Sequence, residues 1–163
     1  AKIHAIVCVI GEKADDFHRT RSKPDGSAVI GALKVTLADA AVSPDAIDYV
    51  NAHGTGTPEN DKMEAMSLEA VFGERMRHVP ISSNKSMIGH TLTAAGAIEA
   101  IFSIKTMEEG VIPPTINYKH PDPAIPFDVV PNKARDARVT AVMSNSFGFG
   151  GQNASLILTR EPA

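Results

Sequence analysis

The stretch VPISSNKSMIGHTLTAAGAIEAIFSIKTMEEG, residues 79–110, decides the fold. Its first four residues have the length and apolar content of a short buried strand, and a polar loop over residues 83–89 follows. A long run without proline then continues to Gly110, a residue type that commonly ends helices. This run opens with Ala94-Ala95-Gly96-Ala97, which carries almost no side-chain bulk. We therefore predict a strand, a loop and a helix that packs closely against another element.

The alternation of strand and helix extends to both sides of this stretch. Further strands are predicted at residues 3–10, 48–52, 140–144 and 153–159, and helices at 27–41 and 58–71, with a helical turn from Ser43-Pro44. Gly11 is expected to end the first strand. Residues 12–26 should form a loop, and the proline-rich residues 112–131 should be irregular. The pattern implies one α/β domain over residues 1–163, with a mixed five-stranded sheet.

The composition of the chain argues against several classes of protein. Of the 163 residues 43% are hydrophobic, and the net charge is -3 with the basic residues scattered, which argues against nucleic-acid binding. No apolar run approaches the roughly 18 to 20 residues that cross a bilayer, and a signal-peptide pattern is lacking. We expect a soluble, cytoplasmic protein. The single cysteine, Cys8, lies in an apolar run and is expected to be a small buried hydrophobe rather than a nucleophile.

Polar and glycine-rich loops follow three of the predicted strands. In sheets of this kind ligands bind outside the carboxyl ends of the strands. The first loop begins with His53, and the second carries Lys85 and His90, so two imidazoles and an ammonium could face one pocket. Such convergence favours a functional site over isolated structural histidines. The spacing of these residues is not that of a metal motif, and no metal is expected.

The third loop, residues 145–151, contains Phe149 and Gly150. A nucleotide-binding fingerprint needs its glycines to open a helix, whereas a strand is predicted after this loop. Backbone N–H groups flanked by glycine, beside an exposed aromatic ring, suit an oxyanion site or a gate.

Three motifs together carry a family resemblance. HGTGTP at residues 53–58, SSNKSMIGH at 82–90 with the following Ala94-Ala95-Gly96, and NSFGFGG at 145–151 resemble, in order and interval, the C-terminal signatures of elongating β-ketoacyl-acyl carrier protein synthases. The resemblance is to the synthase II type, in the thiolase superfamily, and covers about Ala5 to Leu158. It implies a fold of two similar αβαβα halves, of which this chain is the second. The first half, with the nucleophilic cysteine, is absent.

The resemblance also implies roles for individual residues. His53 and His90 correspond to the pair that holds the thioester carbonyl of malonyl-acyl carrier protein during loss of carbon dioxide. Both are expected to be neutral and to donate from Nε2. Lys85 corresponds to the lysine that supports this site, and Glu99 to its carboxylate partner.

Further site residues are implied around this centre. Phe149 corresponds to the gating phenylalanine, whose backbone N–H completes an oxyanion hole, and Gly150 follows it in the same loop. Thr55 and Thr57 correspond to threonines that bind the pantetheine arm. A second gating loop is implied at Asp15 and His18.

The sequence therefore predicts an acyltransferase that condenses acyl and malonyl thioesters in fatty-acid or polyketide synthesis. The expected partners are acyl carrier protein, the missing N-terminal half and a second copy of the complete enzyme, with no cofactor. Two alternatives remain open: a non-catalytic partner subunit that shapes an acyl tunnel, although such subunits generally lose the histidines, and an acyl- or carrier-protein-binding module.

Overall fold

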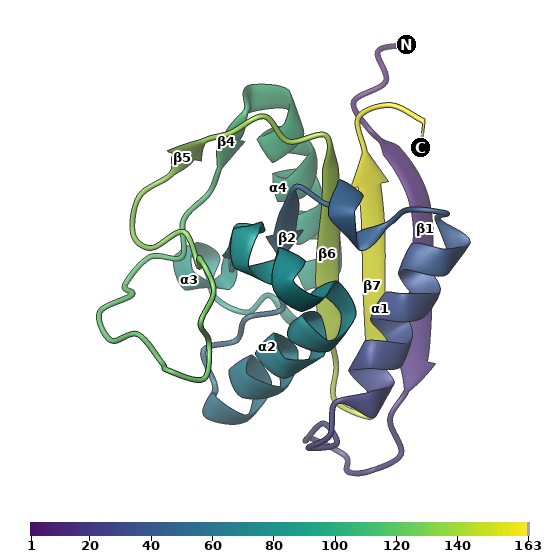
Figure 1. The fold of residues 1–163 in the computed structure, drawn as a ribbon, viewed down its shortest axis with the longest axis vertical. Coiled ribbons are helices and arrows are strands. Elements are labelled where there is room, and N and C mark those ends of the chain that lie inside the picture. The colour runs from purple at the N-terminus through teal and green to yellow at the C-terminus, as the bar shows by residue number, and fades with distance from the viewer. Residues whose placement is uncertain (163) are drawn as a thin grey trace.

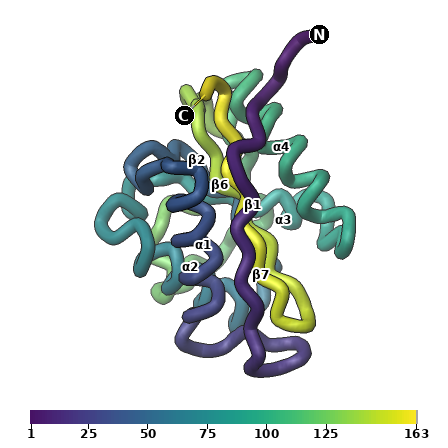
Figure 2. Tube along the Cα trace, turned by 90° about the vertical axis from the view of Figure 1, so that its right-hand side faces the viewer, coloured from purple at the N-terminus to yellow at the C-terminus, as the bar shows by residue number. Residues whose placement is uncertain are grey.

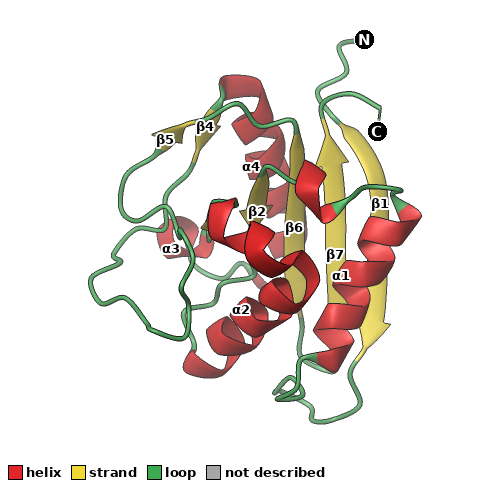
Figure 3. Cartoon of the chain, in the orientation of Figure 1, coloured by secondary structure: helices red, strands yellow, loops and turns green. Residues whose placement is uncertain are grey.

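A mixed five-stranded sheet lies at the centre of the structure, with its strands in the order β1-β7-β6-β2-β3. The computed structural model describes residues 1–162. Helices α1 and α2 cover one face of the sheet and α4 covers the other, as Figures 1 and 2 show from two directions. Figure 3 distinguishes helices, strands and loops. The strands are β1 (Ile6–Ala14), β2 (Tyr49–Asn51), β3 (Ile81–Ser82), β4 (Val111–Ile112), β5 (Arg135–Asp136), β6 (Ala141–Phe147) and β7 (Gln152–Thr159). The α-helices are α1 (Ser27–Asp39), α2 (Pro58–Phe72), α3 (Lys85–Ile88) and α4 (Ala95–Glu109), and 3-10 helices lie at Pro44–Ala46 (η1), Gly73–His78 (η2) and Leu92–Ala94 (η3).

Strand direction brings the functional loops to one edge of the sheet. β2 pairs in parallel with both β3 and β6, whereas β7 pairs antiparallel with both β6 and β1. Strands β2, β3 and β6 therefore end on the same side, and the loops that follow them carry His53, Lys85 and Phe149.

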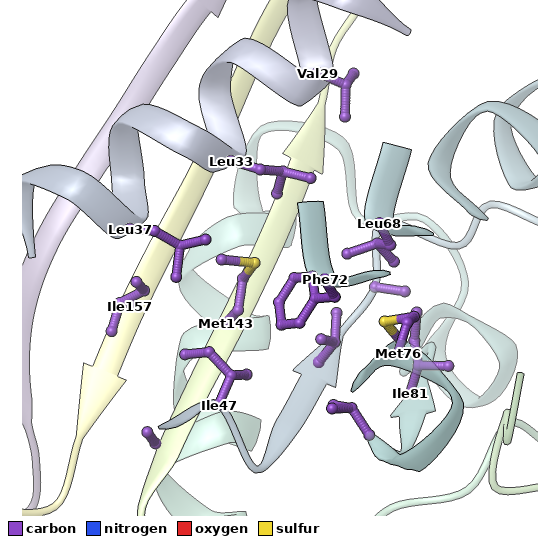
Figure 4. Close-up of a cluster of buried hydrophobic side chains, with 14 of the residues drawn as sticks. Val29, Leu33, Leu37, Ile47, Leu68, Phe72, Met76, Ile81, Met143 and Ile157 are labelled. Carbon is purple, nitrogen blue, oxygen red and sulfur yellow. The ribbon is translucent and has the colours of Figure 1, made fainter. Parts of the chain in front are cut away.

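The first hydrophobic core fills the space between the sheet and helices α1 and α2 (Figure 4). Val29, Leu33 and Leu37 are spaced by four residues, so they lie on one face of α1 and are buried. They belong to one cluster with Met143 of β6 and Ile157 of β7. The same cluster includes Ile47, Leu68, Phe72, Met76 and Ile81.

The second core lies on the opposite face, beneath α4. Successive side chains of a strand point to opposite faces, so Met143 and Ile157 enter the first core while their neighbours Val142 and Leu158 enter the second, with Met107 of α4. Both faces of β6 and β7 are thus covered. The consecutive apolar residues of these strands follow from that double burial.

The five predicted strands, the two long helices before residue 79 and the mixed α/β sheet are confirmed. The prediction of the first strand was wrong in two respects. It continues through Gly11 to Ala14, because these residues still pair with β7. Glycine at position 11 allows α1 to approach the strand closely, since a Cβ there would lie 2.3 Å from Thr36 Oγ1. The strand is also an edge strand rather than a buried one, and Val7 and Ile10 are more than half exposed.

Smaller differences lie near the ends of elements. The loop predicted over residues 83–89 contains the short helix α3, and β6 runs on to Phe147 because its last residues still pair with β7. The strand pair of β4 and β5 was not predicted. Among residues 1–162, no helix combines the length and the apolarity that crossing a membrane requires.

Replacing Gly11 by alanine should destabilise the protein by about 1–3 kcal/mol, the usual cost of forcing extra atoms into a packed interior. The new methyl group would meet Thr36 Oγ1 at 2.3 Å and the Thr36 backbone N at 2.7 Å, and the backbone cannot move aside cheaply. Urea unfolding of the purified protein measures the change.

Gly31→Ala is the matched control, because the added methyl group meets only the flexible side chain of Lys13, at 3.2 Å. Alanine is also the better helix former by about 1 kcal/mol, so this variant should equal or exceed the wild type in stability. Equal urea midpoints for Gly11→Ala and wild type would contradict the tight contact between β1 and α1.

Candidate active site

Two histidine rings meet at the carboxyl edge of the sheet. His53 comes directly after β2 and His90 just after α3, and their ring centroids lie 5.4 Å apart with the planes nearly perpendicular, at 84°. His53 is buried and His90 is exposed. Phe147, at the end of β6, lies against His53 with a centroid distance of 5.5 Å. The fold therefore brings the two predicted histidines together and places the end of β6 beside them.

A buried ion pair lies beside the histidines. The ammonium of Lys85 donates to Oε1 of Glu99, and both side chains are almost fully shielded from water. Burial raises the pKa of Glu99, and the charge and hydrogen bond of Lys85 oppose that rise. The expected pairing of these two residues is thus present. It fastens the first residue of α3 to the first half of α4.

Burial and a neighbouring positive charge favour the neutral form of both imidazoles. Burial, followed by the charge of Lys85 and the nearby His90, lowers the pKa of His53 to about 3. Burial and the charge of Lys85 also lower the pKa of His90. Nδ1 of His90 accepts a hydrogen bond of 3.2 Å from the Leu92 N–H, so a neutral ring carries its proton on Nε2. His90 can therefore donate from Nε2 only.

Glu64 holds the backbone of the first loop, a role that was not predicted from the sequence. Its carboxylate accepts hydrogen bonds of 2.9 Å from the N–H groups of both His53 and Gly54. It also contacts the amide of Asn145 in β6, at 3.4 Å. Burial raises the pKa of Glu64, against the opposing effect of the backbone donors. A signal was available, since Glu64 lies four residues before the buried Leu68 on the inward face of α2.

The two predicted pantetheine-binding threonines lie close together, Thr55 partly buried and Thr57 exposed. Their hydroxyl oxygens, Thr55 Oγ1 and Thr57 Oγ1, are 2.9 Å apart, and the turn between them is held by the Gly56 N–H, which donates to Asp61 at 3.3 Å. They follow His53 by two and four residues along the same loop.

The loop of Phe149 and Gly150 contacts the loop that contains Asp15 and His18. The Gly150 N–H donates to the carbonyl of Arg19, and the Asp15 N–H donates to the carbonyl of Gly151, both at 2.7 Å. The ring of Phe149 is 80% exposed. Gly150 thus uses its N–H within this loop pair and does not offer it as an oxyanion donor. The two predicted gating loops are neighbours in the structure.

The side chain of Asp15 holds its own loop together. Its carboxylate accepts hydrogen bonds from the N–H groups of Phe17, at 2.9 Å, and Lys23, at 2.7 Å. His18 accepts a hydrogen bond from the Thr20 N–H at 3.1 Å. A hollow lined by residues 15–19 and Gly150 lies where the two loops meet.

Cys8 lies away from this edge. It is half buried in β1, at the side of the sheet opposite β3, and its sulfur is 3.3 Å from Thr159 Oγ1. Within residues 1–162, no group of three or more His, Cys, Asp or Glu side chains gathers in a way that could hold a metal ion.

Comparison with curated proteins gives consistent relatives. The chain is 43% identical over 160 residues to 3-oxoacyl-[acyl-carrier-protein] synthase 2 of Coxiella burnetii and 43% identical over 157 residues to the protein of the same name from Staphylococcus aureus. These matches cover 98% and 96% of this chain but 39% of each relative. The chain therefore spans about two fifths of the length of these proteins.

Solved structures show the same fold. The ishigamide ketosynthase/chain length factor superposes with a TM-score of 0.93 at 42% identity, covering 99% of this chain and 39% of that one. A β-ketoacyl synthase from Burkholderia phymatum gives 0.91 at 43% identity, covering 99% and 38%. The thiolase-like α/β layers expected from the sequence are thereby confirmed.

The match to a protein family agrees with the curated relatives and with the solved structures. Residues 4–119 match the family described as "Beta-ketoacyl synthase, C-terminal domain", which accounts for most of the chain, including both histidines, the lysine and its carboxylate partner. The chain belongs to the β-ketoacyl synthase family and represents its C-terminal domain.

Proposed function

We propose that this chain supplies the malonyl-decarboxylating half of a β-ketoacyl-acyl carrier protein synthase, which joins an acyl thioester to malonyl-acyl carrier protein in fatty-acid or polyketide synthesis. The observation that carries the proposal is the pair of histidine rings, His53 and His90, 5.4 Å apart beside the buried Lys85–Glu99 pair. Relatives named 3-oxoacyl-[acyl-carrier-protein] synthase 2 support the same activity.

The chemistry needs neutral donors. When the malonyl carboxylate leaves as carbon dioxide, its bonding electrons pass into the thioester and give an enolate. Two Nε2–H groups directed at the enolate oxygen stabilise the charge as it develops, without the cost of reorienting water. The enolate carbon then attacks the acyl carbonyl held on a cysteine, and the cysteine thiolate departs. The low pKa of His53 suits this role, because a protonated ring is not required.

The remaining site residues support these two groups. Lys85 orients the histidine site and is itself oriented by Glu99, while the Phe149 N–H serves the oxyanion of the acyl-cysteine step. Thr55 and Thr57 bind the pantetheine arm of acyl carrier protein. Asp15 and His18 form the second gating loop, opposite Phe149.

The nucleophilic cysteine belongs to a second half. Cys8 is three strands away from β2 and cannot serve the histidine edge. Two large apolar side chains of the α4 region, Leu92 and Ile101, are more than half exposed, as is Val7 of β1, and they suit contact with another layer of helices.

A structure described as a polyketide acyl-carrier protein in complex with its ketosynthase supports the carrier-protein partner. The family resemblance supports a cytoplasmic homodimer of the complete enzyme.

In a synthase that contains this chain and a cysteine-bearing half, His53→Ala and His90→Ala should each lower malonyl decarboxylation by about 10²- to 10³-fold, the typical loss for one oxyanion donor. Acylation of the cysteine should persist. Carbon dioxide release and acyl-enzyme formation measure the two steps separately. Lys85→Ala should impair both steps, because a residue that orients others affects each.

His78→Ala is the matched control, since His78 is exposed on η2. It should leave both steps unchanged. Wild-type decarboxylation by either active-site variant would remove that histidine from the proposed role.

The ring of His53 should remain neutral between about pH 5 and about pH 8, the range in which an ordinary histidine titrates. Its pKa is about 3 in the folded protein against 6.5 in a model peptide, so below about pH 6.5 the unfolded state binds a proton that the folded state does not. The contribution of His53 to stability therefore falls as the pH is lowered. Ring NMR signals, assigned by their loss in His53→Gln, should not shift over this range. A midpoint near 6.5 would contradict the neutral donor.

By itself the chain should form no carbon–carbon bond, because the acyl group must be bound covalently to a nucleophile while the malonyl group is decarboxylated. Mixing or fusing the chain with a matching cysteine-bearing half should restore condensation. The assay supplies acyl- and malonyl-acyl carrier protein and detects β-ketoacyl product by mass spectrometry. Cys8→Ser should leave the restored activity intact. Product from the chain alone that disappears in Cys8→Ser would contradict the assignment of the nucleophile to another half.

A further inference from the structure

A single hydroxyl joins the two loops that carry the histidines. Ser83 follows β3, and its side chain donates a hydrogen bond of 2.6 Å to the carbonyl of Gly54, which follows β2. Gly54 is the neighbour of His53, and Ser83 lies two residues before Lys85. The hydrogen bond between Ser83 and Gly54 therefore joins positions one residue from His53 and two residues from Lys85.

The Gly54 residue is held from both ends. Its N–H donates to Oε2 of Glu64 at 2.9 Å, and its carbonyl accepts from Ser83. Its φ of +43° is in the left-handed region that favours glycine, and a Cβ there would lie 2.5 Å from the Ser83 Cβ. The two loops thus approach too closely for position 54 to carry a side chain without displacing Ser83. Loss of the hydroxyl would release one of the two contacts that fix the peptide next to His53.

Ser83 is in turn fixed on its own side. Its N–H donates to Thr115 Oγ1 at 3.1 Å, and its carbonyl accepts from Ser86 Oγ at 2.8 Å. The Ser86 hydroxyl also accepts from the Ile116 N–H at 2.9 Å. These three hydrogen bonds attach the start of α3 to residues 115–116 and fix the backbone that carries the Ser83 hydroxyl.

We infer that Ser83 is a positioning residue that sets the orientation of the buried His53 ring relative to Lys85 and His90. The inference rests on the proposed function, because it concerns the same decarboxylation site. Ser83 acts through the backbone of Gly54 and not by touching substrate. A hydrogen bond of this kind, once lost, corresponds to a change of roughly 3- to 10-fold in a rate that depends on it.

The test uses the synthase that contains this chain and a cysteine-bearing half. Ser83→Ala should lower kcat for malonyl decarboxylation about 3- to 10-fold with KM nearly unchanged and with acylation of the cysteine much less affected. Ser83→Thr, which keeps a hydroxyl, should recover most of the loss. Ser86→Ala, which removes the hold on the Ser83 carbonyl, should give a smaller loss in the same direction and serves if Ser83→Ala does not fold.

Ser43→Ala is the matched control, because the hydroxyl of the exposed Ser43 also makes one hydrogen bond to the backbone, here as the acceptor from the Asp45 N–H at 3.2 Å, and lies before the opposite end of β2. It should decarboxylate like the wild type. A second comparison uses His53→Ala as background: if Ser83 acts through His53, then adding Ser83→Ala should change the residual rate little.

The outcomes separate the two proposals. Wild-type enzyme that does not decarboxylate malonyl-acyl carrier protein would refute the proposed function itself. Wild-type enzyme that is active, with Ser83→Ala equally active, equally impaired in both steps, or impaired by the same factor in the His53→Ala background, would refute only the role of Ser83.

Discussion

The ion pair between Lys85 and Glu99 is the interaction on which the site depends most. Both groups are removed from water, so loss of either partner leaves an uncompensated buried charge, at a cost of about 3–5 kcal/mol. The pair attaches α3 to α4, and the charge of Lys85 adds to burial in lowering the pKa of His53 and of His90. One contact therefore both fixes a helix and helps to favour the neutral form of two imidazoles.

Much of this arrangement could be predicted, because it follows from strand direction. Short apolar runs and the helices between them indicate parallel strands, and the carboxyl ends of parallel strands share an edge. That reasoning alone brings His53 and His90 together before any coordinates exist. The Lys85–Glu99 pair needed the family resemblance, since spacing along the chain does not say which charges meet. The roles proposed for Phe149 and the threonines rest on the same resemblance.

What could not be predicted depends on contacts between distant residues. Gly11 has the local signal of a strand end, yet the approach of Thr36 from α1 decides its use. Ser83 is one serine among several in a polar loop, and its value comes from the Gly54 carbonyl on another strand. The burial of Glu64 could have been predicted, because it is a carboxylate on an apolar helix face. Its partners, however, are backbone N–H groups, which leave no mark in the sequence.

The pairing of the first strand with the last has a consequence for folding. Among residues 1–162, β1 pairs with no strand other than β7, with Ile6 opposite Thr159, and α1 packs over both strands. During synthesis, residues 6–14 leave the ribosome long before residues 152–159, so the apolar face of α1 has no complete sheet to cover. Closing so long a loop is slow compared with forming local helices. The first core is therefore completed late, and the apolar face of α1 stays exposed until β7 has been made.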